Sequence, residues 1–392
     1  MAVYARMKTW PFFSCLLLAA FCQAQIPESV GMSSARLERA HQLLQSAVAS
    51  RTVGSVIALI ARDDKIVYSE AFGEAAPGVS MPRDAIVRLA SITKPLTATA
   101  VMILFERGQL QLTDPVEKYL PEFAPAEGGG RSITIYDLLT HQAGLPGEGP
   151  ELDAVWEKAK TARGFSLLVS KLPRRFPPGT RFDYGSYGTA YEILGAIVER
   201  VSGRSFKDFL TDEVLSPLQM RDTYFVVPEN KRSRLAVPYR NVEGKLVFAS
   251  QQENDTDFYS GGGGLRSTVN DYYRFCLFLL HHGELGGIRL LSPKTVRLMM
   301  SEHVEMGPDD PAYAWGFGAS VRSRRGGTDL ETPCSYGWNG GTGTLFVVDP
   351  VEHLSIVIFV PSIPGTPGVD ELRQAFVTAA YQGISKSYDH GY

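Results

Sequence analysis

Hydrophobic residues near the start of the chain change spacing twice, and each change marks a new element. Apolar residues at positions 37, 43, 44 and 48 recur with helical spacing after Ser33 and Ser34, which are good helix caps. The segments Ser55–Ala61 and Ile66–Phe72 are rich in β-branched and aromatic residues, and Asp63-Asp64 separates them. This order predicts one helix followed by a β-hairpin.

A second helix is predicted to start at Ser91. Proline lacks a donor N–H and is tolerated in the first turn of a helix, where Pro95 then lies. The residues that follow are apolar on nearly every side as far as Leu104, so we expect this helix to be buried. Gly108 is placed to end it.

The middle of the chain alternates helical patterns with loops. Thr134 and Asp137 have the spacing of a capping box, and Tyr191–Val201 has helical periodicity. Four consecutive glycines, Gly261–Gly264, precede a further helical pattern around residues 272–280. We expect a largely helical part at about 105–260.

Extended patterns return near the end of the chain. Apolar stretches predict strands at Tyr313–Val321, Thr344–Val348 and Leu354–Val360, and residues 369–382 predict a closing helix. Because strand patterns lie at both ends and helical patterns between them, the order favours an α+β fold with an antiparallel sheet flanked by helices. The sheet part is expected at about 25–104 and 261–392.

The first residues, 1–24, have the pattern of a secretory signal peptide. Arg6 and Lys8 precede an apolar run from Trp10 to Cys22, and the small residue Ala24 follows. That run is short for a bilayer span, so we expect cleavage and no membrane span in the mature chain. The sequence predicts an exported protein, periplasmic or secreted, with a single domain over 25–392.

The composition is that of an ordinary globular enzyme. The 392 residues are 44% hydrophobic and 21% charged, with a formal net charge of −3. No run of Lys and Arg indicates a nucleic-acid partner, and no Cys, His and acidic group has metal-ligand spacing, so no cofactor is expected. For Cys276 and Cys334, two buried, unpaired thiols are favoured over a disulfide. The oligomeric state is not predicted.

Ser91 and Lys94 are the strongest candidates for chemistry. Three positions apart at a helix start, they share one face. A serine hydroxyl is a weak nucleophile until a base removes its proton, and a partly dehydrated lysine favours the neutral form that can do so. The motif alone is short enough to arise by chance, and Ser91 also suits a simple helix cap.

Four segments together resemble the β-lactamase-like serine hydrolases, which include class C β-lactamases, penicillin-binding peptidases and family VIII carboxylesterases. In chain order they are Arg88–Pro95, Leu138–Leu145, Pro178–Ser186 and Gly261–Asp271. The resemblance covers about residues 30–385 and implies a β-lactamase/transpeptidase-like fold.

The resemblance also implies roles for individual residues. Ser91 is the nucleophile, Lys94 activates it, and Tyr184 relays a proton to the leaving group. Ser186 stands where Asn is usual in the family, which puts in doubt its help in holding a substrate amide. The backbone N–H groups of Ser91 and Gly341 form the oxyanion hole.

The third motif, Trp338-Asn339-Gly340, departs from that of the family's β-lactamases. They have Lys or sometimes His at the first position, whereas Trp cannot pair with the carboxylate of a β-lactam and resembles the family VIII esterases. We therefore expect Trp338, Asn339, Gly340 and Ser186 to contact a neutral small-molecule ester or amide, with hydrolysis of an ester favoured.

Two other functions remain open. A β-lactamase or a D-Ala-D-Ala carboxypeptidase of the penicillin-binding proteins would use the same acyl-enzyme on a different substrate. A catalytically idle wall-binding or scaffold protein would keep the fold alone, which the presence of Ser91, Lys94 and Tyr184 argues against. His141 is expected to fix a turn instead of acting as a base.

Overall fold

The computed structural model describes residues 26–125, 130–186, 189–250, 258–308 and 310–389. The predicted signal peptide, residues 1–24, lies outside the described residues. In those described ranges, none of the helices has the length and apolar character needed to cross a membrane.

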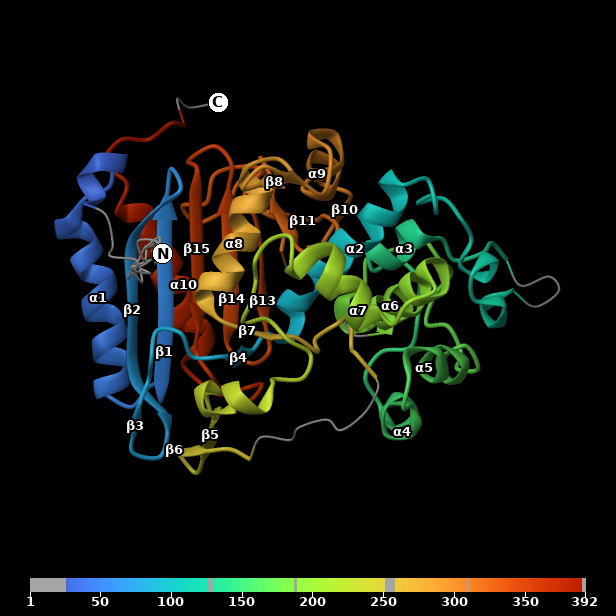
Figure 1. The fold of residues 1–392 in the computed structure, drawn as a ribbon, viewed down its shortest axis with the longest axis horizontal. Helices are drawn as coiled ribbons and strands as arrows, with labels where there is room; N and C mark the ends of the chain where they lie inside the picture. Colours follow the sequence, from blue (N-terminus) through green and yellow to red (C-terminus); the bar gives the residue numbers. More distant parts are fainter. Residues whose placement is uncertain (1–25, 126–129, 187–188, 251–257, 309, 390–392) are drawn as a thin grey trace, which may run out of the picture.

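Within the described residues, nine strands form one antiparallel sheet in the order β10-β11-β12-β13-β14-β15-β1-β2-β3. Strands from the end of the chain therefore lie beside strands from its start (Figure 1). Their bounds are β1 (Ser55–Arg62), β2 (Lys65–Ala76), β3 (Val79–Ser80), β10 (Val304–Glu305), β11 (Tyr313–Trp315), β12 (Ser320–Arg322), β13 (Tyr336–Gly340), β14 (Thr344–Asp349) and β15 (Leu354–Phe359). Three small two-stranded sheets pair β4 (Val87–Arg88) with β7 (Arg266–Ser267), β5 (Tyr239–Val242) with β6 (Lys245–Phe248), and β8 (Glu284–Leu285) with β9 (Ile288–Arg289).

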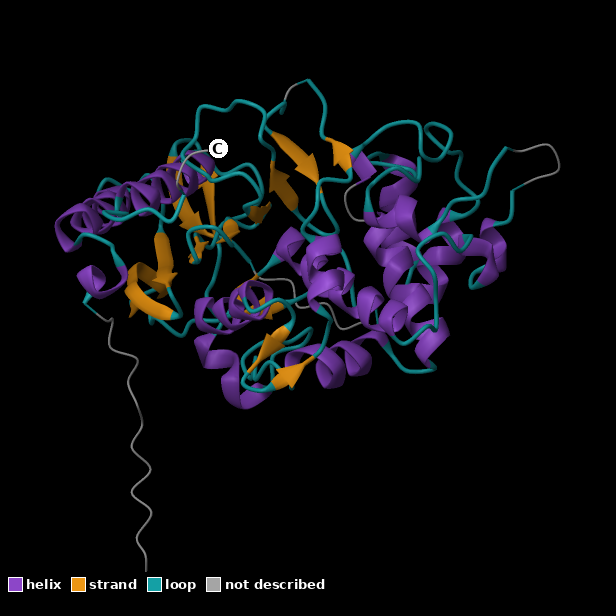
Figure 2. Ribbon diagram, turned by 90° about the horizontal axis from the view of Figure 1, so that it is seen from above, coloured by secondary structure: helices purple, strands orange, loops and turns teal. Residues whose placement is uncertain are grey.

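Helices cover both faces of the large sheet and form the part beside it. They are α1 (Ser34–Ala49), α2 (Lys94–Glu106), α3 (Ile135–Leu139), α4 (Pro150–Lys158), α5 (Ala162–Val169), α6 (Thr189–Ser202), α7 (Phe206–Leu210), α8 (Val269–Leu280), α9 (Pro293–Met299) and α10 (Val369–Gln382). Figure 2 shows most strands on one side of the molecule and a mainly helical part on the other. The predicted α+β class, a sheet flanked by helices, is confirmed.

The central strand β1 illustrates why the sheet is enclosed. All eight of its residues are buried, so both faces of the strand need a covering layer. Val56, Ala58 and Ile60 belong to the core beneath α1 and α10, whereas Ile57 and Leu59 belong to the core that includes α2 and α8. Alternate side chains of one strand thus join two separate cores.

The predicted hairpin is confirmed, and one predicted strand is wrong. β1 and β2 pair around Asp63 and Asp64, whose φ angles of 48° and 61° are those of a tight turn. The stretch Tyr313–Val321, predicted as one strand, forms β11 and β12 with a turn between them. Gly318 in that turn has φ of 96°, and a Cβ there would lie 2.7 Å from Pro95 Cα, so the chain reverses against α2.

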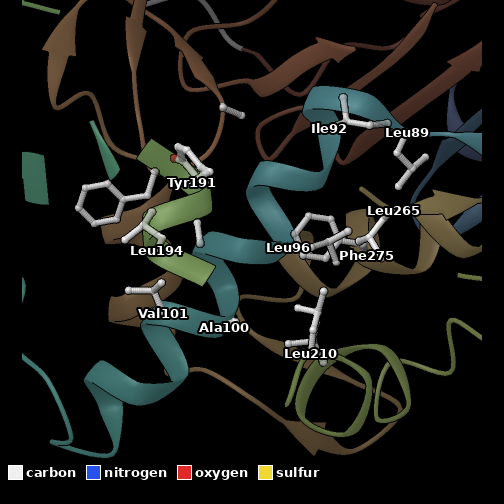
Figure 3. Close-up of a cluster of buried hydrophobic side chains, with 14 of the residues drawn as sticks. Leu89, Ile92, Leu96, Ala100, Val101, Tyr191, Leu194, Leu210, Leu265 and Phe275 are labelled. Atoms are coloured by element: carbon white, nitrogen blue, oxygen red, sulfur yellow. The ribbon is translucent and has the colours of Figure 1, made fainter. Parts of the chain in front are cut away.

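Helix α2 is buried along its length, as predicted. Every residue from Lys94 to Leu104 is buried. In Figure 3, Tyr191 and Leu194 of α6 lie on one side of α2 and Phe275 of α8 lies on the other. Burying a single Leu or Phe side chain contributes about 1.5–3 kcal/mol. This packing fixes the N-terminal end of α2, where Ser91 and Lys94 lie.

The two cysteines of the described part are unpaired. Cys276 is buried in α8, as expected. Cys334 is exposed, so the prediction of a second buried thiol is wrong. It lies in the connection between β12 and β13, where its φ angle of 76° is that of a turn. No apolar pattern in the sequence predicts this surface turn.

Candidate active site

Ser91 lies in a short 3₁₀ turn, Ala90–Thr93, that leads from β4 into α2. The preceding Ala90 has φ of 49°, a left-handed conformation that costs energy for any residue except glycine. A Cβ at Gly263 would already be in contact with Ala90, so the glycine-rich segment packs closely against this turn. The surrounding structure therefore holds the backbone before Ser91 in a strained conformation.

Two hydroxyl groups tie the strand before Ser91 to the large sheet. Thr342 Oγ1 donates to the carbonyl of Arg88 at 2.6 Å, and Thr344 Oγ1 donates to the carbonyl of Leu89 at 2.7 Å. Both threonines belong to the β13–β14 region. The position of Ser91 is thus set by strands that lie far away in the sequence.

The amine of Lys94 lies in position to activate Ser91. Its Nζ is 3.0 Å from Ser91 Oγ and also donates to the carbonyl of Gly262 at 3.0 Å. The side chain is 1% exposed, so little water competes for its protons. The amine is therefore within reach to exchange a proton with the hydroxyl of Ser91.

A buried carboxyl group, Glu192 of α6, holds the glycine-rich segment that Lys94 contacts. It accepts hydrogen bonds from Ser260 Oγ at 2.6 Å and from the N–H groups of Gly261 and Gly262 at 2.9 and 3.1 Å. Burial raises the pKa of Glu192 from 4.5 to about 7, although these bonds and the charge of Lys94 act in the opposite direction. The carbonyl that fixes Lys94 is therefore positioned by a group that titrates near neutrality.

Tyr184 reaches the same site from the second motif. Trp338 Nε1 donates to its phenol oxygen at 2.8 Å, and Lys94 Nζ lies 5.3 Å from the centre of its ring. Because an indole N–H can only donate, the phenol's own hydrogen is not used in this contact. Tyr184 thus stands beside the Ser91–Lys94 pair with its oxygen oriented by Trp338.

His141 lies directly behind this group. Its ring contacts Tyr184, Tyr191 and Trp315 at centroid distances of 4.9, 5.2 and 5.0 Å. Burial and the nearby Lys94 lower the pKa of His141 well below 6.5, so the ring is neutral at physiological pH. Its backbone has φ of 53° and its carbonyl accepts from Asp183 N, so His141 occupies a turn.

Gly340 brings the end of β13 against the turn that bears Ser91. A Cβ at Gly340 would lie 2.3 Å from the carbonyl oxygen of Leu89 and 2.2 Å from Thr344 Oγ1. Arg373 of α10, 5% exposed, donates to the carbonyls of Gly340 at 3.0 Å and Thr344 at 2.8 Å. These contacts place Gly341, the next residue, at the rim of the site.

The site opens into a cavity of about 570 Å³. Its catalytic side is formed by Ser91, Lys94, Tyr184, Asn339 and Gly341. An apolar and largely aromatic wall is formed by Trp156, Phe225, Val226, Phe258, Tyr259 and Pro364. A cavity of this size and lining suits a small molecule with an apolar portion.

Of the site residues predicted from the sequence, five line the cavity, two lie behind it, and the side chain of one is not described. Ser91, Lys94, Tyr184, Asn339 and Gly341 line the cavity together. Trp338 and Gly340 lie behind its surface, the first bonded to Tyr184 and the second packed against Leu89. Ser186 follows in the 3₁₀ turn Tyr184–Ser186, and its side chain lies outside the described residues.

Sequence reasoning missed Glu192 and the aromatic wall. The signal for Glu192 is a single acid within the otherwise apolar run from Thr189 to Val198. An acid on a buried helix face needs partners and is a marker of function. In the part of the chain that the structure describes, no three His, Cys, Asp or Glu residues are grouped to hold a metal ion.

Comparisons with known proteins agree with this geometry. The Beta-lactamase family model matches residues 40–379. Esterase EstB of Burkholderia gladioli is 29% identical over 379 residues, covering 85% of this chain and 92% of the esterase. A putative D-alanyl-D-alanine carboxypeptidase of Escherichia coli strain K12 is 28% identical over 384 residues, covering 88% and 86%.

Among solved structures, EstCE1, a hydrolase with promiscuous acyltransferase activity, superposes with a TM-score of 0.77. It is 24% identical, and the match covers 90% of this chain and 99% of EstCE1, so it supports the fold. The chain belongs to the beta-lactamase family, whose members are serine hydrolases.

Replacing Glu192 with Gln is expected to change the pH dependence of turnover. The carboxylate can accept from all three donors, whereas Gln presents an N–H₂ group to one of them and leaves it unpaired. In the wild type, kcat/KM should rise as pH increases through about 7 and Glu192 ionises. In Glu192→Gln that inflection should disappear, and kcat/KM above pH 7 should fall about tenfold.

Because folding raises the pKa of Glu192 from 4.5 to about 7, the folded chain binds this proton more tightly than the unfolded chain. As pH rises from 4.5 to about 7, the free energy of unfolding of the wild type should therefore decrease. In Glu192→Gln this decrease should be smaller. Glu371→Gln, the loss of an exposed acid on α10, serves as the control. An unchanged pH–rate profile in Glu192→Gln would show that the carboxyl group does not act on Lys94.

Replacing Trp338 with Phe is expected to lower kcat about three- to tenfold with little change in KM. The ring contact with Tyr184 is kept, and a single hydrogen bond of about 0.5–1.5 kcal/mol is lost. Steady-state kinetics on one ester measures the effect. Trp156→Phe, on the cavity wall, should alter KM instead; an equal fall in kcat there would contradict the role assigned to Trp338.

Proposed function

We propose that this protein is an exported carboxylic ester hydrolase that works through an acyl-enzyme on Ser91. The observation that carries the proposal is the 3.0 Å distance between Ser91 Oγ and Lys94 Nζ within a cavity that Tyr184 also lines. A nucleophile, its base and a second proton carrier thus face one substrate-sized space.

In the proposed reaction, neutral Lys94 accepts the proton of Ser91 as Oγ attacks the ester carbonyl carbon. The resulting oxyanion accepts hydrogen bonds from the backbone N–H groups of Ser91 and Gly341. Collapse of the tetrahedral intermediate expels the alcohol, which takes a proton delivered through Tyr184 from the Lys94 ammonium. Water then attacks the acyl-enzyme with the same groups in reverse order, which releases the acid and restores Ser91.

Three features support an ester over a β-lactam or peptide. The third motif has Trp338 in place of a cation, and its N–H is engaged by Tyr184. The apolar wall of the cavity is largely aromatic and suits an apolar acyl or alcohol group. Esterase EstB is also similar over most of this chain.

A D-Ala-D-Ala carboxypeptidase is the second candidate. The similarity to a putative D-alanyl-D-alanine carboxypeptidase of Escherichia coli favours it. Such an enzyme, or a β-lactamase, would form the same acyl-enzyme with an amide. Transfer of the acyl group to an acceptor other than water is a further variant, suggested by the promiscuous acyltransferase activity of EstCE1.

The purified chain distinguishes these functions when it is given three substrates in parallel. They are a p-nitrophenyl ester of a short acid, a chromogenic β-lactam and a peptide ending in D-Ala-D-Ala. An esterase hydrolyses the ester with the highest kcat/KM. Faster release of D-Ala or faster β-lactam opening would favour the second candidate, and no turnover at all would favour an idle scaffold.

Export is part of the proposal and needs a separate test. The chain expressed in a bacterium should appear outside the cytoplasm with a new N-terminus near residue 25. Fractionation and intact mass measure both. An uncleaved chain confined to the cytoplasm would contradict export without affecting the esterase proposal.

A further inference from the structure

Two arginines face each other beside the nucleophile. Arg88 of β4 and Arg266 of β7 are directly opposed partners in the small antiparallel sheet. Side chains in such a pair project from the same face of the sheet about 4.5–5.5 Å apart at Cβ, and like charges in that arrangement repel. Arg88 is only three residues before Ser91, so the pair lies at the entrance to the catalytic turn.

The two arginines differ in how their side chains are held. Arg266 is anchored, because its Nη1 donates to the carbonyl of Phe225 at 2.7 Å. Arg88 is exposed, and within the described residues its guanidinium forms no hydrogen bond or ion pair. An arginine held in place by its backbone and offering a planar set of donors is suited to an anion.

Both arginines line the cavity that contains Ser91. They also line an adjoining cavity of about 260 Å³, together with Ser250, Thr342 and Pro364. Among the described residues that line the larger cavity, the charged side chains are Arg88, Arg266, Lys94 and Glu192, and the last is engaged by the glycine-rich segment. The described lining of the smaller cavity contains no acid. Arg88 is thus a cation of both cavity linings whose guanidinium has no charged partner among the described residues.

We infer that Arg88 is a subsite for a carboxylate of the substrate. The substrate class is an ester that has a free carboxylate several atoms away from the reacting carbonyl, either on the acyl part or on the alcohol part. The guanidinium of Arg88 donates two parallel N–H···O bonds to the carboxylate, and the ester carbonyl extends to Ser91. This inference rests on the proposed ester hydrolysis and differs from the expectation of a neutral ester.

The subsite also gives a reason for the departure in the third motif. Trp338 leaves that position without a cation, whereas Arg88 supplies one on the strand that leads into Ser91. Since the two positions lie on different strands, a carboxylate at Arg88 is approached from a different side of the cavity than one held at position 338. The site is thus suited to acid-bearing esters that differ in shape from penicillins.

Matched substrates test the subsite. The first pair is mono-p-nitrophenyl glutarate and the same ester with its acid capped as a methylamide, which places the charge on the acyl part. The second pair is 3-(butyryloxy)benzoate and its methylamide, which places the charge on the alcohol part. The measurement is the ratio of kcat/KM for the acid over the capped ester, because the ratio removes any general loss of activity.

The wild type should prefer the acid in at least one pair, and the pair that shows the preference identifies the source of the carboxylate. Arg88→Gln should lower that ratio about tenfold or more, and Arg88→Lys should restore part of it. Arg39→Gln, an exposed arginine on α1 outside both cavities, is the control for loss of one positive charge and should keep the ratio.

A second measurement needs no variant and therefore does not depend on the folding of Arg88→Gln. Raising the salt concentration from about 20 mM to about 500 mM should lower the wild-type ratio, because ions screen the carboxylate from Arg88. A wild type that prefers the capped ester in both pairs overturns the inference, as does an unchanged ratio in folded Arg88→Gln.

Failure of the proposed function is distinguishable. If no ester is turned over, the esterase proposal is lost, and the subsite is judged by calorimetric binding of glutarate monomethylamide to the wild type and to Arg88→Gln. Binding that requires Arg88 supports the subsite, and equal or absent binding in the two chains overturns it.

Discussion

Ser91→Ala should lower kcat for ester hydrolysis by a factor of about 10⁴ or more, while the fold is retained. The substitution removes the only atom of this residue that can form the acyl bond, and Lys94 Nζ, 3.0 Å from that atom, loses the proton it is placed to accept. Kinetics on a p-nitrophenyl ester measures the loss. Labelling by a fluorophosphonate, which reacts with activated serines, should disappear in the same variant.

Ser46→Ala is the matched control for Ser91→Ala. Ser46 is exposed on α1, on the far side of the sheet from α2, so its loss should leave both kcat and labelling unchanged. If Ser91→Ala retains labelling or more than a small fraction of turnover, the nucleophile is a different group. The proposed mechanism would then have to be abandoned.

Gly340→Ala should cause the second largest loss, about 10²–10³-fold in kcat. A Cβ there would lie 2.3 Å from the Leu89 carbonyl oxygen, so β13 must shift away from the turn that bears Ser91. Such a shift displaces the N–H of Gly341 relative to that of Ser91, and these are the two donors proposed for the oxyanion. Overpacking also costs about 1–3 kcal/mol of stability, which thermal unfolding measures.

The neighbouring glycine provides the comparison for stability. A Cβ at Gly341 would meet no atom closer than 3.6 Å, at Pro364 Cγ, so Gly341→Ala should fold with nearly wild-type stability. Gly340→Ala is informative because its steric clash lies behind the cavity surface. Unchanged kcat in a folded Gly340→Ala variant would show that β13 does not position an oxyanion donor.

Local patterns in the sequence were sufficient for several elements. The hairpin of β1 and β2 follows from two β-rich segments around Asp63-Asp64, whose left-handed φ angles the turn requires. The capping box of Thr134 and Asp137 was also predicted from local spacing, and the structure contains both of its hydrogen bonds. These features depend on residues a few positions apart, so they can be predicted without knowledge of the tertiary structure.

The structure departs from the predictions where a conformation or a contact depends on residues far away in the sequence. The split of Tyr313–Val321 into β11 and β12 follows from the approach of Gly318 to Pro95, which no local pattern reveals. The hydrogen bond from Trp338 Nε1 to Tyr184, 154 positions earlier in the chain, has no local signal either, and contact of Trp338 with substrate stays a prediction.

The sequence by itself determined that Ser91 and Lys94 are neighbours, because they lie one helical turn apart and any helix start brings them together. It also determined the class of fold, through the order of its strand and helix patterns. Only the tertiary structure decided what surrounds the pair. Glu192 reaches the glycine-rich segment 69 and 70 positions away, and Arg88 opposes Arg266 in a strand pair. Those contacts depend on the packing of α6 and on the register of β4 with β7, which are properties of the whole chain.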